Sequence, residues 1–489
     1  MEFSQLIRIS QVENVNFFLS DTQNMFYGAI VISPHYFFVT DHSRQVDSPW
    51  IQTRLIDSVS VKSVTSENVV EIKLKNFVKC EISLDSFDKA TLIAVSLDNL
   101  SKVTDIQHQL ALAKKLSVID DGWNLYGAES DLYDAINTGL WRISYVNADY
   151  TLCDTYSQQC AVPSTISDET LRIGADCRQG NRFPILVMLY GVNPICKAGP
   201  FSNNRSKQEN MLLDAIASSS PQGGYIVDVS PTNNNNPQIR QWKILRKPLD
   251  DVRLKTPGDI SWLDMVRECL KYACLVSQCV SREQSAVLVQ GETSRVAVVV
   301  SLASILLIPV CRNYVGFQSL ICREWCHAGH SFQSIEGRLM FTLFLDCVWQ
   351  LLQQFPSAFE FSEDLLHLIL TNSCASSYGT FLCNSELERA QAGLQLHSSS
   401  IWTYLSKEDV KAAYKNPLYR RRDTFNICSV APQSIKVWRS LYYQSHNESY
   451  QKELSKAAEV ADENIMLINE IERLEAAFKS VIMENGDKT

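Results

Sequence analysis

The sequence lacks the features of membrane-spanning and nucleic-acid-binding proteins. Acidic residues number 54 against 45 basic ones, and the net charge of −9 argues against bulk electrostatic binding to nucleic acid or an acidic membrane. A local basic pocket is compatible with that balance. The longest apolar run, residues 296–311, is interrupted by Ser301, Ser304 and Pro309. It falls short of the ~20 apolar residues of a spanning helix, so we expect a buried core helix there.

A disulfide framework and a secretory leader are also missing. The 15 cysteines are odd in number and scattered without regular spacing. Residues 1–5 have neither the basic start nor the apolar stretch of a signal peptide. We therefore expect reduced thiols in a cytosolic protein.

The chain does have an ordinary globular composition over a considerable length. Its 489 residues allow two or three domains, and 45% hydrophobic residues is typical of globular proteins. Residues 1–105 read as short strands, with a hairpin turn at Pro34, closed by a helix at 87–100; this predicts a small barrel or sandwich. Residues 120–443 alternate strands and helices and become mostly helical after Pro309, which predicts an α/β sheet with helical cover.

A strand, a tight loop and a buried helix follow one another at residues 286–308. Residues 286–289 are a continuous aliphatic run typical of a buried strand, Gly291 breaks the pattern, and either Thr293 or Ser294 is a candidate helix cap. Loop N–H groups and a helix N-terminus converging on an anion form a phosphate cradle. Cysteine-dependent phosphatases keep a thiolate at the end of such a strand and an arginine across the loop.

No thiol stands at that strand end. Gln290 and Gly291 occupy it, glycine has no side chain, and of the usual apparatus only Arg295 remains. We predict no catalytic residue and interpret the loop as a degenerate phosphate cradle, with Arg295 either holding an anion or forming a local ion pair. Its residues are Gln290, Gly291, Glu292, Thr293, Ser294 and Arg295.

A last helix is expected over residues 445–483. Its apolar positions follow the 4-3-4-3 spacing of a coiled-coil seam, with Asn464 at an a position that can fix register and pairing. The alternative is a helix docked on its own domain. The predicted seam, and the predicted partner-binding set, is Val460, Asn464, Leu467, Ile471, Leu474, Phe478 and Val481.

Other chemistry-bearing patterns favour structural roles. Cys322, Cys326, His327 and His330 have helical spacing like a zinc set, yet we expect helix packing, no metal and no cofactor. Cys383 has an arginine, Arg389, six residues on, but the acids between them disfavour a reactive thiolate. Cys269, Cys274 and Cys279 lie on an apolar helix and are expected in the core. Basic residues that could form a phosphoinositide patch, or simply keep strand edges soluble, are Arg44, Arg54, Lys62, Lys73 and Lys75.

Motifs along nearly the whole chain resemble the myotubularin family of phosphoinositide 3-phosphatases. The resemblance implies an N-terminal PH-GRAM domain (1–105), a cysteine-phosphatase-like domain (120–443) and a coiled coil (445–483). The family loop reads His-Cys-Ser-Asp-Gly-Trp-Asp-Arg-Thr; Gly291 takes the place of its cysteine, and the loop here is about two residues shorter. The motifs include Trp141-Arg-Ile-Ser-Tyr-Val-Asn, Arg182-Phe-Pro-Ile-Leu, Gly329-His-Ser-Phe, Phe344-Leu-Asp-Cys-Val-Trp-Gln-Leu, Tyr378-Gly-Thr-Phe-Leu-Cys-Asn and Val430-Ala-Pro-Gln-Ser.

The resemblance therefore implies an inactive branch of the family, a pseudophosphatase. Inactive members pair with active ones and tune their activity or location, so we expect an adaptor that heterodimerises with an active phosphoinositide 3-phosphatase; a homodimer stays open. The alternative is a phosphoinositide-binding membrane scaffold without a phosphatase partner. Either function places the chain in the cytoplasm, with peripheral association to endomembranes, and neither involves nucleic acid.

Overall fold

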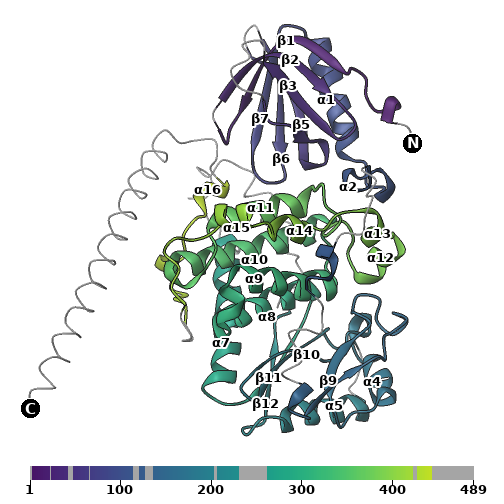
Figure 1. Ribbon diagram of the computed structural model, residues 1–489, viewed down its shortest axis with the longest axis vertical. Coiled ribbons are helices and arrows are strands. Elements are labelled where there is room, and N and C mark those ends of the chain that lie inside the picture. Colours follow the sequence, from purple (N-terminus) through teal and green to yellow (C-terminus); the bar gives the residue numbers. More distant parts are fainter. Residues whose placement is uncertain are drawn as a thin grey trace, which may run out of the picture.

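The computed structural model describes residues 3–22, 24–41, 48–64, 67–113, 121–126, 136–202, 206–230, 262–421 and 427–442. In Figure 1 an N-terminal β-sheet, a middle layer of helices and a second, smaller β-sheet follow one another along the long axis. The predicted coiled coil at 445–483, the basic residue Arg44 and the asparagine run at 233–236 lie outside the described residues.

The N-terminal region is one seven-stranded antiparallel sheet covered by a helix. The predicted hairpin is confirmed, because β2 pairs antiparallel with β3. The strands expected to form a small barrel or sandwich belong to one hydrogen-bonded sheet, in the order β4-β3-β2-β1-β7-β6-β5. The helix expected to close it is α1, which packs on β5 and β6. The elements are β1 (Gln11–Leu19), β2 (Asn24–Ile32), β3 (Tyr36–Asp41), β4 (Ile51–Gln52), β5 (Ile56–Val64), β6 (Glu67–Leu74), β7 (Lys79–Leu84) and α1 (Phe87–Ser101).

The second sheet has the order β10-β11-β13-β12. Strand β13 runs parallel to both neighbours, β11 and β12, whereas β10 is antiparallel to β11. The predicted strand at 286–289 is confirmed as β13, while β11 was missed because a proline and a lysine interrupt its apolar pattern. The elements are β10 (Ile185–Tyr190), β11 (Asn193–Ala198), β12 (Gly224–Asp228) and β13 (Ala286–Gln290), beside a short pair β8 (Trp141–Ser144) and β9 (Cys160–Pro163).

Helices pack on both faces of β13. Successive side chains of a strand point to opposite faces, and those of β13 are apolar on both. Leu288 packs with Leu212 of α5 (Lys207–Ser218) and Leu171 of α4 (Asp168–Ala175). Val287 and Val289 point the other way, against helices α7 (Trp262–Ser281) and α8 (Thr293–Leu307). β13 is therefore buried on both faces between β11 and β12, whereas the edge strand β12 is mostly exposed.

The middle layer is helical, as predicted after Pro309. Helix α8 is buried almost throughout, which confirms the core helix expected there. The apolar core of the helical layer is continuous with the core of the N-terminal sheet. In the part of the chain that the structure describes, no helix combines the length and apolar character needed to cross a membrane. The remaining helices are α2 (Leu110–Ala113), α9 (Tyr314–Ile321), a π-helical turn (Cys322–His327), α10 (Ile335–Gln354), α11 (Glu363–Cys374), α12 (Glu386–Gln391), α13 (Leu394–His397), α14 (Ile401–Leu405), α15 (Glu408–Ala413) and α16 (Arg439–Tyr442).

The start of α8 differs from the prediction. Thr293 and Ser294 were the candidate caps, but both lie inside the first turn, and the N-cap position belongs to Glu292, whose side chain makes no capping hydrogen bond. The helix therefore begins closer to β13 than expected. This early start leaves only Gly291 and Glu292 between strand and helix.

Candidate functional site

The predicted loop lies at the carboxyl end of the central strand of the second sheet. Gln290 at the end of β13 is in register with Ala198 of β11 and Asp228 of β12. The carboxyl ends of parallel strands are where open α/β sheets place their ligand sites. The structure thus brings the loop to the position where a phosphate cradle would be found.

The backbone at Gly291 leaves no space for a side chain. Its φ is +146°, a conformation that essentially only glycine adopts. A Cβ at this position would lie 2.9 Å from Val229 Cγ2 and 3.1 Å from the backbone nitrogen of Ser230. The neighbouring β12 loop therefore packs directly against the position where a nucleophile would stand.

Gln290 is held by hydrogen bonds on both sides. Its Oε1 accepts from Arg178 Nη1 at 2.9 Å, and its Nε2 donates to Asp228 Oδ2 at 2.8 Å. The backbone N–H of Ser230 also donates to the Asp228 carboxylate, at 2.8 Å. Burial tends to raise the pKa of Asp228, but these hydrogen bonds outweigh it and lower the pKa. Asp228 is thus a carboxylate that bonds to Gln290.

Arg178 is fully buried beneath the loop, and each of its three guanidinium nitrogens donates a hydrogen bond. Its Nε and Nη2 donate to Glu209 Oε1 at 3.0 and 2.5 Å, and its Nη1 also donates to the Gly199 carbonyl at 2.7 Å. Its guanidinium carbon lies 3.7 Å from the centre of the Phe201 ring. A guanidinium with these partners is a structural support of the loop.

Arg295, the remaining cation of the cradle, forms a local ion pair. Its Nη2 lies 2.8 Å from Glu268 Oε2 of α7, and its Nε is buried without a hydrogen-bond partner. Two roles were considered for Arg295, and the contact that the structure shows is the local ion pair. Burial raises the pKa of Glu292, Glu336 adds to that rise and Arg295 opposes it. An acidic group at this place disfavours a bound anion.

Ser294 and Thr293 begin α8 at the back of the loop. Ser294 Oγ lies 3.2 Å from His330 Nδ1, and His330 Nε2 lies 3.0 Å from the Gly337 carbonyl. Burial lowers the pKa of His330 to about 3, so its ring is neutral and can donate through Nε2 while accepting from Ser294. Thr293 is half-buried.

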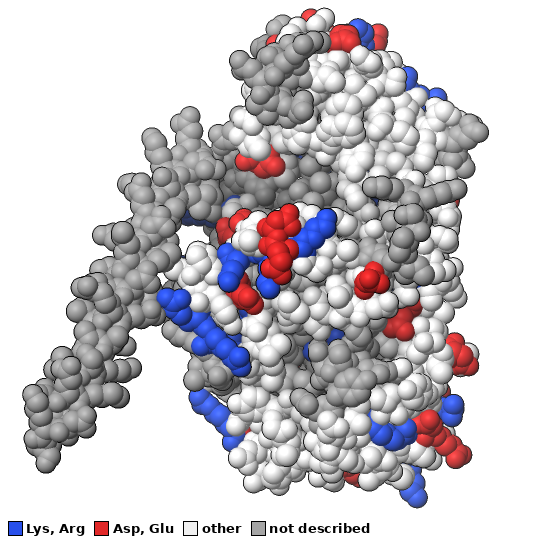
Figure 2. All heavy atoms as spheres, viewed as in Figure 1, with Lys and Arg blue, Asp and Glu red and all other residues white. Residues whose placement is uncertain are grey.

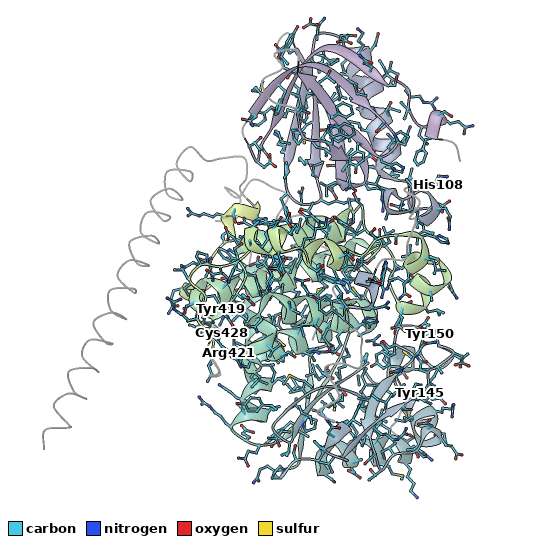
Figure 3. All side chains as sticks on the ribbon, in the orientation of Figure 1. His108, Tyr145, Tyr150, Tyr419, Arg421 and Cys428 are labelled. Atoms are coloured by element: carbon cyan, nitrogen blue, oxygen red, sulfur yellow. The ribbon has the colours of Figure 1, made fainter. Side chains whose placement is uncertain are left out.

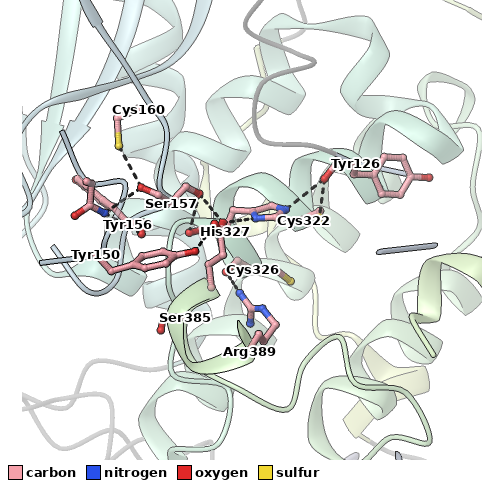
Figure 4. A network of polar contacts seen from close by, with 12 residues as sticks. Tyr126, Tyr150, Tyr156, Ser157, Cys160, Cys322, Cys326, His327, Ser385 and Arg389 are labelled. Atoms are coloured by element: carbon pink, nitrogen blue, oxygen red, sulfur yellow. Dashed lines mark hydrogen bonds and ion pairs between the residues drawn. The ribbon is translucent and has the colours of Figure 1, made fainter. Parts of the chain in front are cut away.

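Of the residues with zinc-like spacing, Cys322, Cys326 and His327 lie in a polar network (Figure 4), while His330 has the separate contacts given above. His327 Nδ1 lies 2.8 Å from Glu386 Oε2, and Tyr150 and Ser157 donate to the same carboxylate at 2.8 and 3.0 Å. The described residues hold no group of metal-ligating side chains with suitable geometry. This network joins the π-helical turn to α12 and to the segment after β8.

Cys383 and Arg389 do not form an anion site. Arg389 is buried and donates to the backbone carbonyls of Cys383 and Cys326, so its guanidinium already has hydrogen-bond partners within the fold. Burial raises the pKa of the Cys383 thiol to about 11. Both observations agree with the structural role expected for this pair. Cys269, Cys274 and Cys279 are buried, as predicted.

The four described members of the predicted basic set lie in two separate places. Lys62 and Lys73 pair with Glu71 on the sheet surface, whereas Lys75 donates to the Arg54 carbonyl. Arg54 itself reaches Ser101 and, in the helical layer, Gln333. Among the charges coloured in Figure 2, blue and red groups are interspersed on the face shown.

Sequence reasoning missed the residues that support the loop. Arg178, Asp228 and Glu209 come from three separate segments, and none of them stands in a spacing that points to Gln290. Asp228 follows a recognisable strand, so its place at the carboxyl edge of the sheet was the one available signal. Arg178 and Glu209 offered no such signal in the sequence. Arg178 is 112 residues from Gln290 and 31 residues from Glu209, and contacts over such separations arise from tertiary packing.

Comparisons with known proteins agree with this architecture. The family description "Myotubularin-like phosphatase domain" matches residues 105–243 and 246–390. Myotubularin-related protein 9 of Homo sapiens is 30% identical over 512 residues, covering 92% of this chain and 92% of the relative. The Bos taurus protein of that name is 29% identical with the same coverage. A phosphatidylinositol-3,5-bisphosphate 3-phosphatase of Homo sapiens is 28% identical over 91% of this chain and 72% of its own length.

Proposed function

Because this chain belongs to the myotubularin family, we propose that it is a catalytically inactive member, a pseudophosphatase that acts as an adaptor or regulatory subunit. The partner would be an active phosphoinositide 3-phosphatase of the same family. The observation that carries the proposal is Gly291: the position of the nucleophile has no side chain and no space for one. Without a thiolate, no covalent phosphoryl intermediate can form.

The surroundings of the loop support the same conclusion. Arg178 and Asp228 hold Gln290, so the groups nearest the strand end already bind each other. Arg295 pairs with Glu268, and Glu292 places a carboxyl group at the N-cap position of α8. Each feature weakens anion binding, because a phosphate would have to displace an ion pair and approach a carboxyl group.

Partner binding is assigned to the seam predicted at 445–483. Its apolar positions, with Asn464 as the register residue, would pair with a similar helix of the active relative. We propose that this heterodimer raises the activity of the partner or changes its location, at the surface of an endomembrane. A homodimer through the same seam is the competing assembly.

The experiment uses the whole purified chain and an active relative. We would titrate this chain into the human phosphatidylinositol-3,5-bisphosphate 3-phosphatase, following co-elution and phosphate release together. The expected result is a stable complex with increased turnover, while this chain alone releases no phosphate. Phosphate release by the chain alone, retained after further purification, would overturn the pseudophosphatase assignment.

The Gly291→Cys variant tests the pocket itself. A thiol placed there meets Val229 and the strained backbone, so we expect no restored activity. Robust hydrolysis of phosphatidylinositol 3-phosphate by this variant would contradict the view of the pocket as closed.

The scaffold alternative requires phosphoinositide binding by residues 1–105 without any phosphatase partner. The contacts of Lys62, Lys73 and Lys75 give it little support, since their charges are paired or buried. Absence of a complex with any active relative, together with liposome binding by this chain, would favour the scaffold.

A further inference from the structure

Two cysteines that are far apart in the sequence face each other in the helical layer. Cys274 of α7 and Cys428 have their Sγ atoms 3.3 Å apart, at a sequence separation of 154 residues. Cys428 belongs to the segment 427–442, which is hydrogen-bonded to α7 and α10. Figure 3 labels it at the edge of the helical layer. The two sulfur atoms would need to approach by only about 1.2 Å to reach disulfide bond length.

Hydrogen bonds of the two residues after Cys428 hold this part of the chain beside both helices. Arg267 Nε of α7 donates to the Val430 carbonyl at 3.0 Å. Gln354 of α10 exchanges two hydrogen bonds with the Ser429 backbone, at 2.7 and 3.0 Å. The backbone around Cys428 is therefore attached to both helices, so the two thiols face each other as part of the packed structure.

This pair differs from the other thiols nearby. Cys274 is 8% exposed and Cys428 is 3% exposed, whereas Cys269 and Cys347 are 2% and 0% exposed. Cys322 and Cys326 lie on the same helical turn, so a bond between them would tie together no separate elements. Among the described cysteines, the Cys274–Cys428 pair thus combines proximity with a long intervening chain.

We infer that Cys274 and Cys428 are a redox modification site, which closes to a reversible disulfide when a hydroperoxide is present. The Cys274 thiolate attacks one oxygen of hydrogen peroxide, the O–O bond breaks, and a sulfenic acid and hydroxide form. The Cys428 sulfur then attacks the Cys274 sulfur, the S–S bond forms and water leaves. Overall, two thiols and one peroxide give one disulfide and two waters, and two electrons pass from sulfur to oxygen.

The local chemistry is consistent with this order of attack. The hydrogen bond from Cys428 lowers the pKa of Cys274, and burial opposes this effect. The same hydrogen bond raises the pKa of Cys428. Cys274 is therefore the thiol that forms a thiolate first and is also the more exposed of the two.

The disulfide would tie α7 to the segment that leads toward residues 443–489. Helix α7 also carries Glu268, the partner of Arg295. Oxidation would thus join the helix beside the degenerate loop covalently to the segment before the predicted seam. This inference does not depend on the proposed adaptor function.

The test is peptide mapping of the full chain after treatment with hydrogen peroxide. We expect a cross-linked peptide containing Cys274 and Cys428 under non-reducing conditions, which dithiothreitol removes. The wild-type chain should also show a thermal midpoint a few degrees higher when oxidised than when reduced. Cys274→Ser and Cys428→Ser should each lose both signals, whereas Cys279→Ser, a buried cysteine of the same helix, should keep them.

Three outcomes would overturn the inference. Oxidation of Cys274 that stops at a sulfenic or sulfinic acid would show that Cys428 does not resolve it. Disulfides at other pairs in equal yield would show that the facing geometry gives no selectivity. A thermal shift that persists in Cys428→Ser would assign the effect to other oxidised groups.

Discussion

Val229 stands against Gly291 so closely that a Cβ on the glycine would lie 2.9 Å from Val229 Cγ2. The Val229 N–H donates to the Gln290 carbonyl at 2.9 Å, which fixes the two loops relative to each other. The end of β12 therefore fills the place that a nucleophilic side chain would need. The absence of a side chain at position 291 and the close packing of the neighbouring loop thus coincide at one residue.

Replacing this glycine should destabilise the fold. Gly291→Ala combines a backbone at φ +146° with a steric overlap, so we expect a loss of about 2 kcal/mol or more in unfolding free energy. Gly139→Ala is the control, because Gly139 has φ +74° but no atom within 4 Å of its Cβ position; about 1 kcal/mol is expected there. Chemical denaturation measures both. Equal losses in the two variants would show that the contact with Val229 relaxes without cost.

The buried ion pair below the loop should be sensitive to removal of one partner. Arg178 and Glu209 are both 0% exposed at their side chains, so Arg178→Met leaves an unpaired buried carboxylate and should cost about 3–5 kcal/mol. The exposed pair of Lys102 and Asp98 gives the comparison, since Lys102→Met should change stability by at most about 0.5 kcal/mol.

A double variant separates charge from packing at the same place. Arg178→Met with Glu209→Leu removes both charges, and we expect it to recover most of the stability lost in the single variant. A double variant as unstable as Arg178→Met alone would mean that the hydrogen bonds to Gln290 and Gly199 carry the effect.

Strands and helices were easier to predict from the sequence than the contacts between distant segments. Aliphatic runs gave β13 and α8, because burial on both faces of a parallel strand leaves a continuous apolar pattern. β11 was missed since Pro194 and Lys197 lie within it; Lys197 is nevertheless buried and paired with Glu324. The glycine at the strand end was recognised because it interrupts the aliphatic run, and the resemblance matched it to the position of the family cysteine. The hydrogen bonds of Gln290 to Arg178 and Asp228 were beyond prediction, because no periodic pattern links three distant segments.

Buried histidine makes stability depend on pH in the mildly acidic range. Burial lowers the pKa of His330 to about 3, against an ordinary value of 6.5. Between these values the unfolded chain binds a proton that the folded chain does not, so stability falls as pH falls, by up to about 1.4 kcal/mol per pH unit. Burial also lowers the pKa of His367, to about 4, which adds to the slope in the same direction.

Measuring unfolding free energy between about pH 6.5 and 5 isolates this effect, since most carboxyl groups titrate below that range. His330→Gln should reduce the slope, whatever its effect on absolute stability, and exposed His397→Gln should leave the slope unchanged. An unaltered slope in His330→Gln would mean that His330 takes up a proton in the folded state.

The predicted seam makes the adaptor proposal testable without touching the described core. Leu467→Asp with Leu474→Asp places two carboxylates at d positions, and we expect at least a tenfold loss of affinity for the active relative because apolar d contacts are lost. Asn469→Asp with Ala476→Asp adds the same charges at f positions, which face away from a coiled-coil partner, and should leave capture intact. The stability of the isolated chain tests the alternative of a helix docked on its own domain. If the helix is docked, the two aspartates should lower the thermal midpoint of the seam variant even without a partner. If the seam variant and the f-position variant bind the active relative with equal affinity, the coil is not the interface, and a partner would have to bind elsewhere on the chain.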